Sequence, residues 1–341
     1  MKYFITVNYT HDFNNIYLHF LYYCKYFLNL MQSHNTKLPM LNTPAILLST
    51  FNGDRFLRAM LDSVASQIGV NLVLYWRDDG STDSTAEIVR SYRASIDLRE
   101  LPWSGRLGPC SSFLSILREA APHHTSFHFA DQDDVWKPGK VAHARKVVTQ
   151  NEVPTLFHCR QQLIDCSDRP LRLSRLSGSG SFQNALCENI AVGCTVAFNQ
   201  SAALLVAKEN PKYALMHDWW AYLVVSTVGR IEYDSYPWIH YRQHSQNVVG
   251  GSHGVFKDWY KRVRRQISRP SNAPTRIGQL LDLLDIHGEI LTYEQRSQVE
   301  RLLAGKTSLS QRLKNCVVPP ATRQSWVDQL LLRGILLTNR F

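Results

Sequence analysis

The sequence predicts an α/β protein built on a doubly wound, mostly parallel sheet, with helices added at its C-terminal end. Apolar runs of strand length alternate with segments whose apolar residues recur at helical spacing, a pattern typical of a parallel sheet covered by helices on both faces. Several of these runs end in polar loops, where open sheets of this kind hold their ligands. The 341 residues suffice for one large domain and a smaller appendage.

The expected elements follow one another in alternation from residue 43 onward. Strands are expected over residues 45–49, 72–76, 98–101, 126–130, 155–159, 188–198 and 231–236. Helices are expected over residues 56–64, up to 92, and over 110–121, 141–149 and 216–228, with Ser81 or Asp83 as the cap of the second. Residues 173–182 are rich in Ser, Gly and Arg and predict a surface loop.

The C-terminal region, residues 255–341, is predicted to be helical. Residues 256–267 place apolar side chains on one face and Lys and Arg around the rest, which indicates a basic amphipathic helix. This helix either packs on the domain or lies on an anionic membrane surface. Capping-box patterns begin at Thr292 and Ser308, and a final amphipathic segment covers residues 326–337.

Residues 1–42 form an N-terminal extension that is left unassigned. Its aromatic and leucine-rich run is interrupted by charged and polar side chains, so it falls short of a membrane span, and it lacks the cleavage site of a signal peptide. Three interpretations stay open: an interfacial anchor, an extension packed on the domain, or residues upstream of a later start at Met31 or Met40. The last is favoured.

The charge and the cysteines narrow the choice of partners. With 38 basic against 28 acidic side chains the net charge is +10, which suits nucleic acid, an acidic membrane surface or a phosphorylated substrate. No nucleic-acid-binding motif accompanies this charge, so nucleic acid is not expected as a partner. The seven cysteines form no C-x-x-C pair, which predicts reduced thiols in a cytosolic protein, with neither a disulfide framework nor a zinc site.

Three carboxylates follow the expected strand at 126–130. They are Asp131, Asp133 and Asp134. Carboxylates this close repel one another unless a cation lies between them, and hard oxygen ligands in an Asp-x-Asp spacing suit Mg²⁺ or Mn²⁺ shared with substrate phosphates. The alternative is a solvated acidic turn that caps the next helix.

Taken together, four stretches resemble the family-2 glycosyltransferases, which have the GT-A fold, and among these the bacterial rhamnosyltransferase-type enzymes. The stretches are Ser49-Thr50-Phe51-Asn52-Gly53, Arg77-Asp78-Asp79-Gly80-Ser81-Thr82-Asp83, Asp131-Gln132-Asp133-Asp134-Val135-Trp136, and His217-Asp218-Trp219-Trp220 with Tyr241-Arg242-Gln243-His244. They occur in the order that the family has. The resemblance implies a GT-A domain over residues 43–254.

The resemblance also implies a role for each site residue. Thr50, Phe51 and Asn52 would line the nucleotide pocket, Asp78 with Asp79 would hydrogen-bond the base, and Asp131 would complete the nucleotide-sugar site. Asp131 and Asp133 match the metal-binding acids, and His244 could bind the metal as a further ligand or contact the diphosphate. Asp218 matches the catalytic base, although it follows His217 where the family often has Glu.

Each of these residues has a plainer interpretation that stays open. Thr50 and Asn52 could make only a turn, and Asp78 and Asp79 could stabilise a helix start. Asp218 could be a helix cap. Asp134 could hold the loop rather than touch a metal, and His244 could sit in a loop.

The expected function is that of a metal-dependent inverting glycosyltransferase. It would move a sugar, with rhamnose as the best guess, from a nucleotide-diphosphate donor to a glycan or lipid-linked acceptor in surface polysaccharide synthesis. The alternatives are a non-catalytic nucleotide-sugar or glycan-binding protein and a nucleotidyltransferase. The expected location is the cytoplasm, with peripheral contact at the inner face of the cell membrane as an open question.

Overall fold

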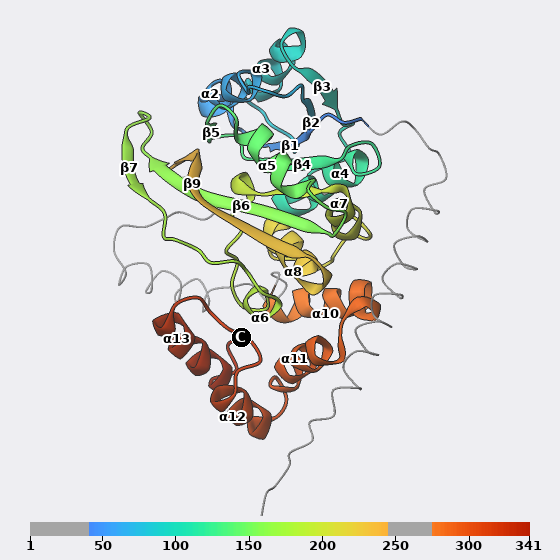
Figure 1. Cartoon of the computed structure of the whole chain (residues 1–341), viewed down its shortest axis with the longest axis vertical. Helices are drawn as coiled ribbons and strands as arrows, with labels where there is room; N and C mark the ends of the chain where they lie inside the picture. The colour runs from blue at the N-terminus through green and yellow to red at the C-terminus, as the bar shows by residue number, and fades with distance from the viewer. Residues whose placement is uncertain (1–40, 245–274) are drawn as a thin grey trace, which may run out of the picture.

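The computed structural model describes residues 41–244 and 275–341 (Figure 1). The N-terminal extension up to residue 40 and the basic helix expected at 256–267 lie outside the described residues. The strands are β1 (Ala45–Thr50), β2 (Val73–Asp78), β3 (Asp97–Glu100), β4 (Ser126–Ala130), β5 (Val135–Trp136), β6 (Thr155–Ile164), β7 (Pro170–Leu173), β8 (Ala197–Asn199) and β9 (Arg230–Arg242). The α-helices are α2 (Asp54–Ala65), α3 (Thr85–Ser91), α4 (Gly108–Ala120), α5 (Lys140–Val148), α6 (Phe182–Ala185), α7 (Gln200–Val206), α8 (His217–Val228), α10 (Arg276–His287), α11 (Tyr293–Ala304), α12 (Leu309–Val317) and α13 (Trp326–Leu337).

These strands form one mixed sheet in the order β3-β2-β1-β4-β8-β6-β9-β5, with β7 paired to β6. The neighbours β3, β2, β1 and β4 are parallel, and so is the long pairing of β6 with β9. The remaining pairings are antiparallel. The predicted α/β fold with a mostly parallel sheet and a C-terminal helical extension is confirmed.

Successive side chains of β1 point to opposite faces of the sheet, and each face is covered by helices. Ala45 and Leu47 pack into one apolar cluster with α4, α7 and α8, whereas Ile46 and Leu48 pack into the other with α2, α3 and α5. All four side chains are fully buried. A strand buried on both faces reads as a continuous apolar run, which is what the sequence shows at this position.

Two of the expected strands are longer than predicted, and one is largely wrong. β6 and β9 extend to Ile164 and Arg242, because they pair in parallel over their whole length, including positions that are polar. In the expected strand at 188–198, only β8 forms, and Gly193–Thr195 is a turn of 3₁₀ helix. A buried apolar run does not by itself distinguish a strand from a buried turn.

The C-terminal helices share the core of the sheet. Leu280 and Leu283 of α10 belong to the same apolar cluster as α8, as do Leu332 and Leu336 of α13. The capping box predicted at Thr292 is present and starts α11, and Ser308 caps α12. None of the described helices is long and apolar enough to cross a bilayer.

Candidate active site

The loops after β1, β2 and β4 lie side by side because these strands are parallel neighbours. Thr50 ends β1 and donates a hydrogen bond to Asp78 Oδ1 at 2.8 Å, while its hydroxyl accepts one from Trp76 Nε1 at 2.9 Å. Asp78 also accepts hydrogen bonds from Ser81 N at 2.8 Å and from Ser81 Oγ at 2.6 Å. These contacts fix the orientation of the Asp78 carboxylate at the end of β2.

Asn52 joins the first two loops. Its φ of 46° is left-handed, a conformation that Asn tolerates better than most residues. Its N–H donates to Ser81 Oγ at 2.9 Å, and its side-chain oxygen accepts from Thr82 N at 2.9 Å. The neighbouring Phe51 ring is 36% exposed and lies 4.0 Å from the guanidinium carbon of Arg106. A partly exposed aromatic ring and a neighbouring cation suit a nucleotide, because the ring can stack on the base and the cation attracts the phosphates.

Gln132 ties the third loop to the first. Its side-chain oxygen accepts a hydrogen bond from Phe51 N at 2.9 Å, and its amide nitrogen donates to Phe51 O at 3.1 Å. The amide group packs directly on Gly53, where a Cβ would come within 2.5 Å of it. Since the φ of Gly53 is an ordinary −111°, a Cβ here would act by displacing the Gln132 amide and not by straining the backbone.

Asp79 is turned inward, away from the exposed Phe51 ring. It is 3% exposed and forms a 2.7 Å ion pair with Arg77, itself only 1% exposed. Its carboxylate also accepts hydrogen bonds from Leu107 N at 2.7 Å and Gly108 N at 2.8 Å. Burial by itself raises the pKa of Asp79, but these hydrogen bonds outweigh it and hold the pKa below its usual value. Asp79 thus anchors the loop that carries Arg106.

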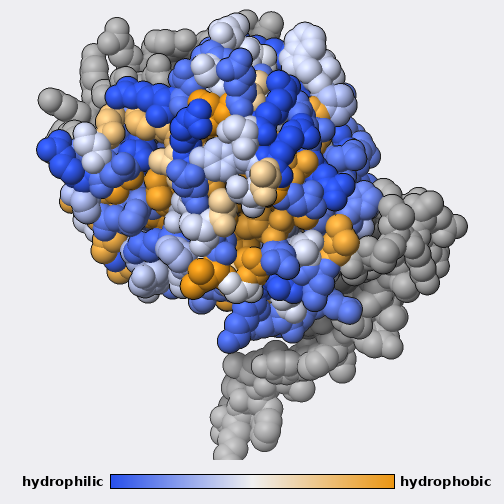
Figure 2. All heavy atoms as spheres, turned by 90° about the horizontal axis from the view of Figure 1, so that it is seen from above, coloured by the Kyte–Doolittle hydropathy of each residue, from blue (hydrophilic) through white to orange (hydrophobic). Residues whose placement is uncertain are grey.

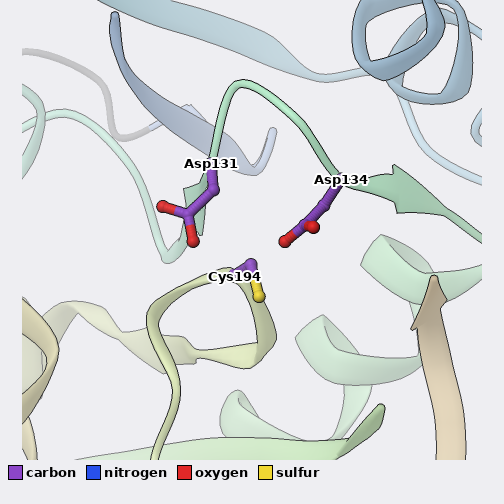
Figure 3. Close-up of side chains that lie close together, drawn as sticks. All are labelled: Asp131, Asp134 and Cys194. Atoms are coloured by element: carbon purple, nitrogen blue, oxygen red, sulfur yellow. The ribbon is translucent and has the colours of Figure 1, made fainter. Parts of the chain in front are cut away.

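The acids after β4 divide into two groups. Asp131, Asp134 and the Cys194 thiol place their donor atoms within 4.8 Å of one another (Figure 3). Burial, followed by the charges of Asp133 and Asp218, raises the pKa of Asp131 to about 8, although the residue as a whole is partly exposed. Burial, followed by the charges of Asp133 and Asp131, raises the pKa of Asp134 well above its usual value.

Asp133 belongs to the other group. Its Oδ2 lies 2.7 Å from His244 Nε2, which brings together residues 111 positions apart. Both side chains keep some exposure, 20% for Asp133 and 9% for His244. Asp134 Oδ1 instead accepts a hydrogen bond from Arg242 N at 2.9 Å, at the end of β9. Asp134 therefore holds the end of β9 against the loop of residues 131–134. The neighbouring Asp133–His244 pair keeps some exposure to solvent.

These donors fit a hard divalent cation. Carboxylate oxygens and one imidazole nitrogen suit Mg²⁺ or Mn²⁺, and such a cation would offset the mutual repulsion of the acids. Asp134 and Cys194 are fully buried, and burial with the nearby acids raises the pKa of the Cys194 thiol well above its usual value. A protonated thiol is a poor ligand. Of these candidate donors, Asp131, Asp133 and His244 keep some exposure, whereas Asp134 and Cys194 do not.

Lys140 places a buried ammonium group near Asp131 and Asp134. It is 1% exposed, and its Nζ has no hydrogen-bond partner among the described residues. Burial lowers the pKa of its ammonium group to about 8, a shift that the nearby thiols and the acids Asp134 and Asp131 partly counter. The acidic loop thus has a positive charge inside the protein in addition to any that a ligand brings.

Asp218 lies in the first turn of α8, one residue after the helix begins. Its Oδ2 accepts a hydrogen bond from Gly193 N at 2.8 Å, and its Oδ1 accepts one from Trp219 N at 2.7 Å. The N-cap is Met216, so Asp218 is not the cap. Burial raises the pKa of Asp218 to about 6, against the opposing effect of Trp219 N, Asn189 and Gly193 N. A buried carboxylate with this pKa is ionised at neutral pH and can accept a proton.

His217, the residue before Asp218, is buried among aromatic side chains. Its ring stacks on Phe113 with centroids 3.9 Å apart and packs edge-on against Phe129. Burial lowers the pKa of His217 to about 3, so the ring is neutral. A Cβ at Gly193 would lie 2.9 Å from His217 Nε2, so that glycine allows the turn before β8 to approach α8.

The sequence motifs lie in the loops that follow β1, β2 and β4 and at the start of α8, and the structure adds contacts of residues for which the sequence predicted no role. It brings Thr50, Asp78 and Asn52 together on one side, and Asp131, Asp133 and His244 around the acidic loop. Sequence reasoning gave no role to Arg77, Arg106, Gln132, Lys140 and Gly193. Arg77 and Gln132 lie inside the motif stretches, and this position was the one available signal for them.

Comparison with known proteins agrees with this arrangement. A mixed sheet with acids at the ends of its parallel strands is the GT-A architecture of glycosyltransferases. The crystal structure of S. aureus TarS 1–349 in complex with UDP-GlcNAc has this fold: it superimposes with a TM-score of 0.54 at 14% identity, covering 88% of this chain and 82% of that one.

The sequence comparisons identify the family. Residues 45–197 match the model of glycosyl transferase family 2. The dTDP-rhamnosyl transferase RfbG of Shigella flexneri is 24% identical over 248 residues, which are 66% of this chain and 84% of that protein. An uncharacterized glycosyltransferase of Nostoc sp. is 22% identical over 166 residues, 48% of this chain and 51% of that protein. These comparisons support a family-2 glycosyltransferase whose matched domain covers residues 45–197.

Proposed function

We propose that this protein is an inverting glycosyltransferase that moves rhamnose from a nucleotide-diphosphate donor to a hydroxyl of a glycan or lipid-linked acceptor, in the synthesis of a surface polysaccharide. The observation that carries the mechanism is the buried, hydrogen-bonded Asp218 carboxylate, which lies close enough to interact electrostatically with Asp131. The similarity to a dTDP-rhamnosyl transferase supports rhamnose as the sugar.

The donor site follows from the first two loops. The exposed Phe51 ring and Arg106 would meet the base and the phosphates, while Asp78, oriented by Thr50 and Ser81, would hydrogen-bond the base. Asn52 keeps the two loops in register. Asp79 acts indirectly, by holding the loop of Arg106.

We further propose that Asp131, Asp133 and His244 hold a divalent cation, Mg²⁺ or Mn²⁺. When bound, this cation supplies positive charge that offsets the charge of the departing nucleotide diphosphate. Asp134 would act indirectly through its hydrogen bond to Arg242 N, which fixes the strand that leads to His244.

Asp218 would act as the base. Its two oxygens each accept one backbone hydrogen bond and keep lone pairs for a further donor. It would take the proton of the acceptor hydroxyl while that oxygen bonds to the anomeric carbon. The bond from this carbon to the phosphate oxygen breaks with its electron pair on the nucleotide diphosphate. One displacement inverts the configuration, so a single carboxylate suffices.

A donor screen tests the proposed function. Nucleotide release would be measured for a panel of nucleotide sugars that includes dTDP-rhamnose and UDP-GlcNAc, with Mn²⁺ and with excess chelator. The expected result is metal-dependent release that is fastest with dTDP-rhamnose, and a product of inverted configuration by NMR. Release from none of the donors, or a product with retained configuration, would contradict the proposal. Reaction is expected in the cytoplasm, at the inner face of the cell membrane.

A further inference from the structure

The helices α12 and α13 expose an unusual amount of apolar surface. The described residues contain 21 large apolar side chains that are exposed, and nine of them lie between residues 309 and 337. These nine are Leu309, Leu313, Val317, Val318, Trp326, Val327, Leu330, Leu331 and Leu337. Exposed apolar side chains gathered in this way mark a surface that binds something.

The side chains form stripes along the two helices. Leu309, Leu313 and Val317 recur every four residues on α12 and are 59%, 51% and 68% exposed. On α13, Trp326 and Leu330 have the same spacing and are 76% and 58% exposed. The opposite sides of the helices are packed, since Leu332 and Leu336 of α13 belong to the core and Asn315 of α12 is buried.

A hollow deepens this surface. A cavity of about 680 Å³ is lined by Leu313, Val317 and Val318 together with Arg301, Gln311 and Lys314. Apolar and basic side chains therefore share its lining. The two helices lie at the end of the molecule away from β1 to β4 (Figure 1), whereas the opposite end shows apolar side chains distributed among hydrophilic ones (Figure 2).

The charge of this segment is mostly positive. Residues 306–341 carry six basic side chains and a single acidic one, Asp328. The basic residues are Lys306, Arg312, Lys314, Arg323, Arg333 and Arg340. An apolar stripe with Trp among leucines, bordered by Lys and Arg, is the composition of helices that lie in an anionic bilayer interface.

We propose that the α12–α13 surface docks on the head groups and outer acyl region of an anionic membrane. The nine apolar side chains would enter the acyl boundary, and the basic side chains would meet the lipid phosphates. Charge complementarity favours this occupant over a second copy of the chain, because two surfaces that are both basic repel. The inference deepens the proposed function, since a lipid-linked acceptor lies in such a membrane, but it can fail independently.

Vesicle binding of the full chain tests this surface without donor or acceptor. Vesicles of phosphatidylcholine alone are compared with vesicles that also contain phosphatidylglycerol. The protein should sediment with the anionic vesicles and leave them as salt rises. Lys314→Glu combined with Arg333→Glu should weaken binding roughly tenfold or more, because each basic side chain near the surface contributes to it. Leu313→Ser combined with Leu330→Ser should also weaken it.

The matched controls carry the same types of substitution, basic to Glu and apolar to Ser, outside α12 and α13. Arg172→Glu with Arg230→Glu alters two exposed basic residues of β7 and β9, and Ile68→Ser removes a side chain that is 62% exposed. These variants should bind vesicles as the wild type does. Brominated lipids should quench the Trp326 fluorescence, seen as the difference between wild type and Trp326→Phe.

Three results would overturn the proposal. The first is equal binding, or no binding, to both vesicle types. The second is unchanged vesicle binding by the α12–α13 variants. The third is a dimer, seen by light scattering, that the serine variants disrupt while the protein binds no vesicles. Nucleotide release with a water-soluble acceptor analogue should be the same for all these variants, so a failure of vesicle binding leaves the donor screen intact, and the reverse also holds.

Discussion

The ammonium nitrogen of Lys140 lies 3.5 Å from the centroid of the Trp136 ring. The ring face thus contacts a cation that is buried without a hydrogen bond among the described residues. Burial is the main cause that lowers the pKa of Lys140, which shows that the charged form is costly despite the ring and the nearby acids.

Lys140→Met should therefore stabilise the protein at neutral pH. The pKa of about 8 lies below the ordinary value of 10.5, so the charged side chain destabilises the folded state below pH 8, and this cost fades as the pH rises from about 8 to 10.5. The expected gain at pH 7 is on the order of 1 kcal/mol or more. Urea unfolding with a chelator at neutral and alkaline pH measures it. Lys137→Met, which removes a cation from the Tyr236 ring, is the control. A less stable Lys140→Met protein would show that attraction by the acids outweighs burial.

The base assignment predicts a pH profile. Asp218 must be ionised to accept a proton, and its pKa is raised to about 6, so turnover should fall tenfold for each pH unit below 6. Asp218→Asn should reduce turnover by roughly 10²-fold or more while the dissociation constant of the donor stays close to the wild-type value. Steady-state rates from pH 5 to 8 and donor titrations check both statements. Turnover of the variant close to wild type would remove Asp218 from this role.

If Asp131, Asp133 and His244 hold the cation, variants of the loop should fall into two classes by their Mn²⁺ affinity. Asp133→Ala and His244→Ala should each weaken Mn²⁺ binding by roughly tenfold or more, because each removes a donor atom. Asp134→Asn and Cys194→Ala should leave it within a few fold, since these buried groups are not reached. Electron paramagnetic resonance of free Mn²⁺ in the presence of a nucleoside diphosphate gives the affinity. The opposite ranking would place the cation between Asp131, Asp134 and Cys194.

Gly53→Ala should disturb the donor site without unfolding the protein. The new Cβ would displace the Gln132 amide and break both of its hydrogen bonds to Phe51. The Michaelis constant for the donor should rise, with turnover at saturation less affected. Gly334→Ala in α13, where a Cβ meets no atom within 4 Å, is the control. An unchanged Michaelis constant for Gly53→Ala would show that the Gln132 bridge has no part in donor binding.

Arg77→Leu should cost stability. It leaves the buried Asp79 carboxylate without its 2.7 Å ion pair, and loss of one partner of a buried pair costs roughly 3–5 kcal/mol. The double variant Arg77→Leu with Asp79→Leu should recover part of the loss. Chemical denaturation of the single and double variants measures this coupling, and equal stability of the two would contradict it.

Much of the fold and the outline of the site could be predicted from the sequence, for identifiable reasons. Strands buried on both faces, such as β1, appear as short apolar runs, and the polar residues that follow them are adjacent in sequence. Contacts between distant residues are not encoded in this way. Asp133 and Asp134 are neighbours with the same side chain, yet one pairs with His244 and the other with Arg242 N. Only the path of β9 distinguishes them.

The Gln132 bridge has a consequence for how this enzyme can diverge. The Gln132 side-chain amide forms hydrogen bonds with both the backbone N–H and the backbone carbonyl oxygen of Phe51, as the backbone of a neighbouring strand would. Insertion of one residue in either loop would break both contacts at once. Relatives that acquire a new donor sugar should therefore change side chains in these loops and conserve the loop lengths, so that specificity evolves by substitution on a fixed frame.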